Sequence, residues 1–265
     1  MLRRLFNQGR KQLPQVPPDC LIYAIGDIHG RADLLEPILA AIDDDLNRSE
    51  ASRCVVVFLG DYMDRGPDSR GVMDRLVAHS NASSAETHYL RGNHEDCLLA
   101  FIREPGTGAG WCEFGGRETL RSYGVTPPPR RAEPDEWAAA SAALREALPP
   151  SHFVLLSDLK PSLEIGDYFF THAGARPGVA LADQTDHDLM WIRREFLDAD
   201  NRFERVIVHG HTPEPKVITD HRRLGIDTGA YATGVLTALR LTGDARSLLQ
   251  TRSIDGAVTV HRVRL

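Results

Sequence analysis

The stretch CVVVFLGDYMDRG, residues 54–66, joins a run of apolar and β-branched residues to an abrupt polar turn. Such a run predicts a buried strand, which Gly60-Asp61 ends. Similar runs lie on either side, and each of the three is followed by apolar residues at helical spacing. The predicted strands are Cys20–Ile25, Cys54–Leu59 and Thr87–Leu90, and the predicted helices are Ala32–Leu46, Ser69–His79 and Glu95–Ile102. This alternation predicts an α/β fold with parallel strands joined by helical crossovers.

The rest of the chain has a different pattern. Residues 104–150 are rich in glycine and proline, which predicts a loop-rich inserted cap with one short helix at Asp135–Ala147. Beyond the cap we expect mostly strands, with one helix at Asp188–Phe196. The predicted strands are Phe153–Leu156, Ser162–Thr171, Arg205–Val208, Lys216–Asp220, Val235–Leu241, Ser247–Thr251 and Val258–Val263. We expect a single domain over residues 1–265, because the chain contains no internal repeat or low-complexity tract.

Composition narrows the range of functions. The chain has 265 residues, a formal net charge of -6 and 42% hydrophobic residues. Such an acidic chain is a poor general binder of nucleic acid, because that affinity depends on cationic contacts to phosphate. No apolar run approaches the roughly 18 residues of a membrane span, so no transmembrane segment is expected. The four cysteines show no CxxC spacing, and we therefore expect reduced thiols and a cytoplasmic location.

Five predicted strand ends carry side chains that can bind a metal ion. Glycines beside these side chains let the backbone turn sharply and come close to an ion. Sites in sheets of this kind form beyond the carboxyl ends of the strands, so we expect the five ends to lie together. They are Gly26-Asp27-Ile28-His29-Gly30, Gly60-Asp61-Tyr62-Met63-Asp64-Arg65-Gly66, Arg91-Gly92-Asn93-His94-Glu95, Thr171-His172-Ala173-Gly174 and Val208-His209-Gly210-His211-Thr212.

The candidate ligands are aspartate, asparagine and histidine side chains, without a thiolate. Oxygen and imidazole donors suit Mn, Fe or Zn rather than a closed structural zinc site. Six such side chains are too many for one catalytic ion that keeps an open position. They suit two ions about 3.5–4 Å apart that share one bridging carboxylate, an arrangement common in phosphatases.

These motifs resemble the signatures of the phosphoprotein phosphatase family of calcineurin-like metallophosphoesterases. The matching segments, in the family's order, are Gly-Asp-Ile-His-Gly (26–30), Gly-Asp-Tyr-Met-Asp-Arg-Gly (60–66), Leu-Arg-Gly-Asn-His-Glu (90–95), His-Ala-Gly (172–174) and Gly-His-Thr (210–212). The resemblance implies a β-sandwich of two mixed sheets flanked by helices, with the inserted cap. Within this family, the chain is similar to bacterial serine/threonine protein phosphatases in particular.

The resemblance also implies a ligand set. Two divalent metal ions would be bound, with Mn2+ expected and Fe or Zn as alternatives. The residues that would hold the first metal are Asp27, His29 and Asp61, and those that would complete the second are Asn93, His172 and His211. Asp61 would bridge the two ions. His209, just before the last motif, is expected to pack beside the ligands.

Catalytic roles follow from the same resemblance. His94 would be the general acid, oriented by Asp64. Arg65 and Arg193 would bind the substrate phosphate together with Asn93, although Arg194 is a rival to Arg193. A metal-bridging hydroxide would attack phosphorus, while His94 protonates the leaving oxygen.

Two substrate classes remain open for such a hydrolase, a phosphomonoester and a phosphoanhydride. The first is a phosphoprotein or phosphopeptide, cleaved at phosphoserine or phosphothreonine. The alternative is a dinucleoside polyphosphate, as in the symmetrical diadenosine tetraphosphatases. For that substrate Trp111, Phe114 and Tyr123 could stack on a base, but they could equally pack the cap. A non-enzymatic metal-binding module is disfavoured, because no ligand and no acid of the set is missing.

Overall fold

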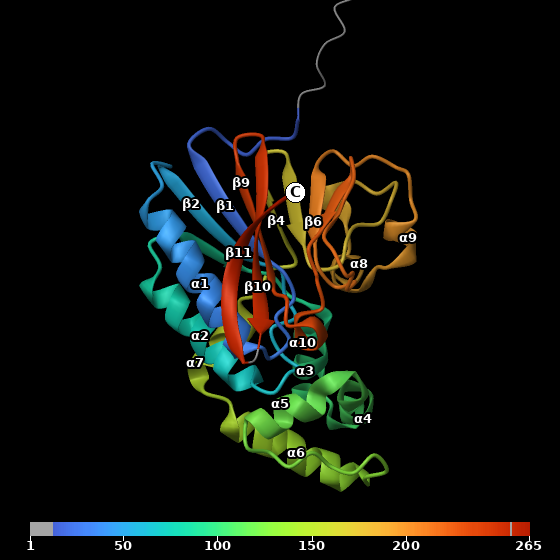
Figure 1. The fold of residues 1–265 in the computed structure, drawn as a ribbon. Coiled ribbons are helices and arrows are strands. Elements are labelled where there is room, and N and C mark those ends of the chain that lie inside the picture. Colours follow the sequence, from blue (N-terminus) through green and yellow to red (C-terminus); the bar gives the residue numbers. More distant parts are fainter. Residues whose placement is uncertain (1–12, 255) are drawn as a thin grey trace, which may run out of the picture.

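A computed structural model describes residues 13–254 and 256–265. Figure 1 shows two β-sheets, with helices beside them and a group of helices at the lower end of the molecule. Both sheets contain parallel and antiparallel strand pairs. The prediction of an α/β fold with two mixed sheets flanked by helices is therefore confirmed.

The first sheet has six strands, and one half of it is the parallel set β1–β2–β3. The antiparallel strands β9, β10 and β11 extend it beyond β1. In spatial order the strands are β11 (Ala257–Arg264), β10 (Ala245–Ile254), β9 (Thr237–Thr242), β1 (Cys20–Ile25), β2 (Arg53–Phe58) and β3 (Glu86–Tyr89).

The second sheet has five strands, of which β5, β6 and β8 are parallel. The outer strands β4 and β7 pair antiparallel to them. In spatial order the strands are β4 (Ser162–Ile165), β5 (Tyr168–Thr171), β6 (Val206–His209), β8 (Arg223–Gly225) and β7 (Ile218–Thr219).

Successive side chains of the buried strands point alternately toward the second sheet and toward the helices. In β1 the side chain of Ile22 joins a core cluster with Phe170 and Val208 of the second sheet. Its neighbour Tyr23 faces the other way and joins the cluster that contains Ile38 of the helical layer. Because successive strand residues point to opposite faces, a strand that is apolar throughout must be covered on both sides.

Helices cover both outer faces. The first sheet packs against α1 (Ala32–Asn47) and α2 (Ser69–Ala82), together with α3 (Asn93–Arg103) and α7 (Pro150–Ser157). The second sheet packs against the short helices α8 (Asp186–Trp191) and α9 (Arg194–Leu197), with a 3₁₀ turn at Leu181–Asp183. A further short helix, α10 (Ala230–Thr233), follows β8.

Three predictions for the second half were wrong in detail. Residues Phe153–Leu156, predicted as a strand, lie in α7, which begins with Pro150 at a position where proline is tolerated. The single strand predicted at Ser162–Thr171 is a hairpin that turns at Gly166, where φ is +59°. The single helix predicted at Asp188–Phe196 is interrupted after Trp191, because Ile192 is extended.

Residues 104–122 differ most from the prediction of a loop. They form a 3₁₀ turn (Pro105–Thr107), α4 (Gly108–Trp111), a π-helical turn (Cys112–Gly116) and α5 (Arg117–Ser122). The glycines serve packing: a Cβ on Gly108 would lie 2.5 Å from a ring carbon of Phe101, and one on Gly116 would lie 2.4 Å from the Trp111 ring. The helix predicted at Asp135–Ala147 is confirmed as α6 (Pro134–Ala147). Figure 1 shows α4, α5 and α6 at the lower end, beyond the ends of the strands.

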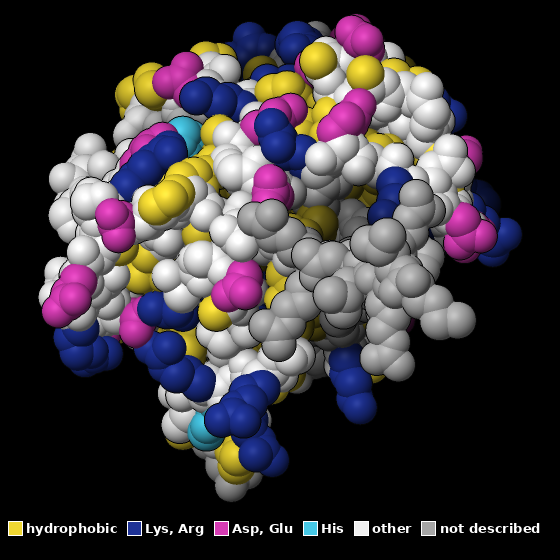
Figure 2. Space-filling view, turned by 90° about the horizontal axis from the view of Figure 1, so that it is seen from above, with side chains coloured by type: hydrophobic (Ala, Val, Ile, Leu, Met, Phe, Trp, Pro, Cys, Tyr) yellow, Lys and Arg dark blue, Asp and Glu magenta, His cyan; other side chains and the backbone are white. Residues whose placement is uncertain are grey.

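Two surface properties bear on the predicted partners. Within the described part of the chain, none of the helices has the length and hydropathy needed to cross a membrane. On the face in Figure 2, Lys and Arg side chains are interspersed with Asp and Glu over much of the surface. The four cysteines are unpaired, as expected.

Candidate active site

The carboxyl ends of β1, β2, β5 and β6 deliver most of the predicted ligands to one place. An unusual backbone conformation orients three of these side chains: His29, Asp61 and His211 have φ values of +47°, +53° and +66°. This left-handed region is costly for residues other than glycine and is found where the surrounding structure enforces it, often at functional sites. Close backbone approach is also required: a Cβ on Gly210 would lie 1.9 Å from Asp27 Oδ1.

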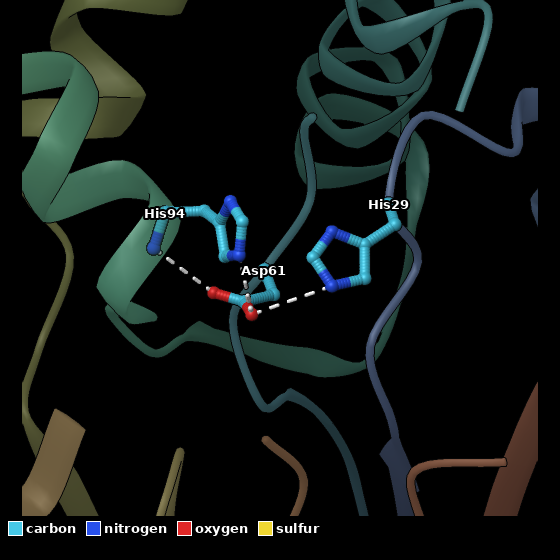
Figure 3. Close-up of side chains that lie close together, drawn as sticks. All are labelled: His29, Asp61 and His94. Atoms are coloured by element: carbon cyan, nitrogen blue, oxygen red, sulfur yellow. Dashed lines mark hydrogen bonds and ion pairs between the residues drawn. The ribbon is translucent and has the colours of Figure 1, made fainter. Parts of the chain in front are cut away.

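One ligand group gathers around Asp61 Oδ2. Figure 3 shows the His29 and His94 rings on either side of the Asp61 carboxylate. The Nε2 atom of His29 lies 3.5 Å from Asp61 Oδ2, and the Nε2 atom of His94 lies 3.7 Å from it. The three residues are buried, and one potential ligand atom from each lies within 4.8 Å of the others. His29 and Asp61 are the predicted metal ligands of this group, and His94 is the predicted acid beside them.

A second ligand group uses the other oxygen of the same carboxylate. Asp61 Oδ1 lies 3.3 Å from His172 Nε2, and His211 completes the group within the same 4.8 Å limit. The amide oxygen of Asn93 lies 3.0 Å from His172 Nε2 and 2.8 Å from His211 Nδ1. Asp61 therefore belongs to both groups, as the prediction of a bridging carboxylate requires.

Donor atoms in these groups fit a pair of divalent ions. His29 Nδ1 donates to the carbonyl of Met63 and His172 Nδ1 to that of Leu59, so the backbone holds both rings in place. The Nε2 atom of His29, which faces Asp61 Oδ2, is buried and has no hydrogen-bond partner. A buried, unpaired imidazole nitrogen is costly unless a ligand satisfies it. The nitrogen and oxygen donors, without sulfur, suit Mn, Fe or Zn.

Asp27 lies beside the two ligand groups. Its carboxylate accepts the backbone N–H of His211, at 3.0 and 3.1 Å, and it belongs to neither ligand group. Its charge nevertheless contributes to the pKa of His172, which places it beside the second group. The assignment of Asp27 to the first metal remains a prediction.

Charges at the site explain the protonation states of the ligands. Burial alone would raise the pKa of Asp61, but the surrounding histidines hold that pKa well below its usual range. Burial likewise opposes the charged form of His172, and the Asp61 carboxylate overrides it and raises the pKa of His172 to about 9. Burial lowers the pKa of His29 to about 3 and that of His211 to about 2, so both rings are neutral at pH 7. Neutral imidazole is the form that binds a metal, so His29 and His211 are already in that form and His172 has to release a proton when an ion binds.

The predicted acid and its partner are in direct contact. His94 Nδ1 lies 2.6 Å from Asp64 Oδ2, and both side chains are buried. Burial alone would lower the pKa of His94, but the Asp61 and Asp64 carboxylates outweigh burial and raise it. The Asp64 carboxylate also accepts hydrogen bonds from Trp111 and Thr119, two contacts that the sequence did not predict.

Arginines predicted to bind phosphate lie at the same site. Arg65 Nη2 lies 3.2 Å from His94 Nε2, and the Arg65 guanidinium lies 4.8 Å from the centre of the Tyr231 ring. Arg193 is exposed, and its charge helps to lower the pKa of His211. This supports Arg193 over its neighbour Arg194 as the second phosphate ligand.

Two further buried residues, Glu95 and His209, support the site. The Glu95 carboxylate accepts three backbone N–H groups, those of Asp61, Tyr62 and Gly92, each at 2.9 Å. It thereby ties the turn after β2 to the start of α3. His209 lies against Phe196 and close to Arg223, which agrees with the expected packing role. The glutamate could have been found from its place three residues after the N-cap Gly92, the position from which a glutamate side chain accepts the N-cap N–H.

Comparisons with known proteins agree with this geometry. A crystal structure of a provisionally named diadenosine tetraphosphatase superposes with a TM-score of 0.57 at 19% identity, covering 95% of this chain and 98% of that one. An asymmetrical bis(5'-nucleosyl)-tetraphosphatase of Halalkalibacterium halodurans is 29% identical over 236 residues, which are 82% of this chain and 88% of the relative. Serine/threonine-protein phosphatase 1 of Salmonella typhimurium is 27% identical over 228 residues, covering 83% of this chain and 91% of the relative.

The family model described as calcineurin-like phosphoesterase matches residues 21–243, a range that begins in β1 and ends just after β9. This range contains both ligand groups and the His94–Asp64 pair. The chain belongs to the calcineurin-like phosphoesterase family of metallophosphoesterases.

Proposed function

We propose that this protein is a two-metal phosphomonoester hydrolase that removes phosphate from serine or threonine side chains. The observation that carries the proposal is the buried His94–Asp64 pair beside two ligand groups that share Asp61. A carboxylate-supported general acid matters most when the leaving group is a poor one, such as the alkoxide of serine or threonine.

Each side chain has a defined task in this proposal. When bound, two divalent ions supply an activated water nucleophile and positive charge for the phosphate oxygens. Asp61 holds its two oxygens toward the two histidine groups. Arg65 and Arg193 bind the phosphate through forked N–H groups, helped by the Asn93 amide.

Proton transfer follows from the neighbouring contacts. Arg65 Nη2 lies 3.2 Å from His94 Nε2, so a phosphate held by Arg65 lies beside the edge of the His94 ring that can give up a proton. Asp64 holds the opposite nitrogen at 2.6 Å and stabilises the imidazolium. His94 Nε2 therefore donates its proton to the departing oxygen, and the ring is reprotonated from solvent. We expect Mn2+ to support the reaction, with Fe or Zn as alternatives.

A dinucleoside polyphosphate is the second candidate substrate, and two exposed aromatic rings favour it. Phe114 is 58% exposed and Tyr231 is 37% exposed. Tyr231 lies under the Arg65 guanidinium, and Phe114 precedes Gly115, whose carbonyl accepts the Arg65 N–H. Exposed aromatic rings beside a phosphate-binding arginine are suited to stack on a nucleobase. Relatives named asymmetrical tetraphosphatases also support this candidate.

The other two aromatic residues are buried, and this changes the expectation for them. Trp111 and Tyr123 are 2% and 4% exposed. Neither ring is available to stack on a base without rearrangement. Base stacking, which the sequence left open for Trp111, Phe114 and Tyr123, is therefore proposed for Phe114 and extended to Tyr231.

A substrate panel distinguishes the two candidates. Phosphoserine, phosphothreonine and phosphotyrosine peptides and diadenosine tetraphosphate would be tested with Mn2+ and with a chelator. We expect turnover of the phosphoserine and phosphothreonine peptides that the chelator abolishes. If only diadenosine tetraphosphate is cleaved, the second candidate replaces the first, and the products then give the mode of cleavage: ATP with AMP for asymmetrical, two ADP for symmetrical.

A further inference from the structure

The Asp64 carboxylate receives more hydrogen bonds than its contact with His94 requires. Its side chain is 0% exposed. Oδ2 lies 2.6 Å from His94 Nδ1 and accepts the indole N–H of Trp111 at 2.7 Å. Oδ1 accepts the hydroxyl of Thr119 at 2.5 Å. Both carboxylate oxygens are thus fixed by donors from a different part of the chain.

Those donors come from one continuous segment. Trp111 ends α4 and Thr119 lies in α5, with the π-helical turn Cys112–Gly116 between them. The same segment also holds the backbone, because the carbonyl of Gly115 accepts the N–H of Arg65 at 3.2 Å and Thr119 Oγ1 accepts the N–H of Asp64 at 3.0 Å. Residues 111–119 therefore contact Asp64 and Arg65 through both side chains and backbone.

Backbone conformation shows why such support is needed. Asp64 and Arg65 each have a φ of +68°, in the left-handed region that neither residue type prefers. Two consecutive residues in this region persist only when the surroundings over-determine them. Gly115 is fitted closely, because a Cβ there would lie 2.4 Å from the Arg65 nitrogen.

We propose that Trp111 and Thr119 are positioning residues, which hold the Asp64 carboxylate so that Oδ2 faces His94 Nδ1. Thr119 donates a hydrogen bond to Oδ1, and Trp111 donates one to Oδ2, the oxygen that also contacts His94. The carboxylate cannot then rotate away from the ring, and the ring keeps Nε2 toward Arg65. The inference rests on the proposed function in one respect, the role of His94 as the proton donor.

Packing alone does not account for Trp111. Its ring lies against Phe101 with centroids 5.1 Å apart, and Trp137 of α6 also meets Phe101, at 6.3 Å. Both tryptophans are buried. Of these two tryptophans, Trp111 donates to Asp64 and Trp137 does not. Trp137 is therefore a matched control for the loss of an indole in the same core.

The first test compares Trp111→Phe and Thr119→Val with the controls Trp137→Phe and Thr119→Ser. Loss of a hydrogen bond to a buried carboxylate predicts about a 10- to 100-fold lower kcat with an alkyl phosphate, with KM nearly unchanged. With p-nitrophenyl phosphate the loss should be smaller, because that leaving group scarcely needs a proton. Thr119→Ser, which keeps the hydroxyl, should retain the activity that Thr119→Val loses. Equal losses on both esters, or equal losses in Trp111→Phe and Trp137→Phe, would overturn the proposal.

The second test does not depend on activity. In the protein loaded with diamagnetic Zn2+, the His94 Nδ1 proton should give a strongly deshielded NMR resonance because of its short contact with Asp64. We expect Trp111→Phe and Thr119→Val to shift or broaden this resonance, and Trp137→Phe to leave it in place. An unchanged resonance in both variants contradicts the inference. If instead His94→Asn keeps full activity on the alkyl phosphate, the proposed function has failed in its acid step, whatever the resonance shows.

Discussion

The strand ends and the segment 108–122 serve the same site in opposite ways. Ligands at the ends of β1, β2, β5 and β6 come from turns beside glycines, and backbone carbonyls such as those of Met63 and Leu59 orient their rings. Residues 108–122 place none of their side chains in the two ligand groups. Their contribution is a set of hydrogen bonds to Asp64 and Arg65. The first region supplies reactive atoms, and the second fixes the angle of a side chain.

The two regions should therefore respond differently to substitution. A ligand atom that is removed leaves an ion without a partner, whereas a supporting hydrogen bond that is removed leaves the site populated but less ordered. Substitutions at the strand ends should therefore have large effects on metal binding. Substitutions in the segment should affect turnover and leave the metals in place.

The largest effect is expected at Asp61. Asp61→Asn removes the charge that both ligand groups share, and several kcal/mol of transition-state stabilisation correspond to a loss of about 10³-fold or more in activity. Metal content measured after dialysis should fall for both ions. Asp33→Asn, a change in an exposed carboxylate that pairs with Arg31, is the control and should retain both metals. Retention of both metals by the Asp61 variant would show that this carboxylate does not bridge.

A smaller but chemically specific loss is expected at His94. His94→Asn should keep the metals and lose about 10²- to 10⁴-fold in turnover of an alkyl phosphate, the range for general acid catalysis. The loss with p-nitrophenyl phosphate should be smaller. Rates with both esters and metal content would be measured on one preparation. Near-normal turnover of the alkyl phosphate would remove His94 from the acid role.

Gly115 tests the segment through its backbone. Gly115 has a φ of +111°, and an added Cβ would meet the Arg65 backbone. Gly115→Ala should therefore lower the free energy of unfolding by about 1–3 kcal/mol and reduce turnover, without loss of metal. Gly110→Ala is the matched control, because nothing lies within 4 Å of a Cβ there and alanine favours the helix. Thermal unfolding of the two variants gives the comparison, and equal stability would show that this close approach is not needed.

The smallest effect is expected on the pH dependence of stability, through hydrogen bonds that connect the end of the segment to α2. Tyr123, directly after α5, has its hydroxyl 2.9 Å from His152 Nδ1, and His152 Nε2 lies 2.9 Å from Asp74 of α2. Burial lowers the pKa of His152 despite the opposing effect of Asp74. The unfolded chain therefore takes up a proton at higher pH than the folded one, and stability falls as the pH drops below about 6.5.

His152→Gln removes this proton uptake. We expect the fall in Tm between about pH 7.5 and about pH 5.5 to be smaller in the variant by about 2 °C or less. His88→Gln, at a side chain paired with Glu86 away from the segment, serves as the control. An identical pH dependence in His152→Gln and in the unaltered protein would contradict the assignment.

The sequence predicted the strand-end half of the site well for a physical reason. Polar residues beside glycines after apolar runs are local signals, and parallel strands bring such ends together. Asp61, His29 and His172 could thus be placed near one another before any contact was known. The α/β class followed from the same alternation, whereas the two mixed sheets were implied by the family resemblance, and both are confirmed.

The segment could not be predicted in this way. Its glycines at 108, 115 and 116 are typical of a loop in the sequence. In the structure they allow aromatic rings and the Arg65 backbone to lie close to the backbone of the segment. No spacing links Trp111 to Asp64, because that contact depends on how α4 packs against α3. The apolar run at Phe153–Leu156 was ambiguous between strand and helix, and only its packing against α2 decides.

Left-handed backbone at five non-glycine positions of the site, His29, Asp61, Asp64, Arg65 and His211, has an evolutionary consequence. Glycine would adopt each of these conformations with less strain, so a glycine there should make the empty fold easier to form. Selection for stability alone would therefore erode the site at the positions that perform chemistry. Aspartate, arginine and histidine at these five positions therefore make the fold less stable than glycine would, while they provide the side chains that the proposed reaction uses.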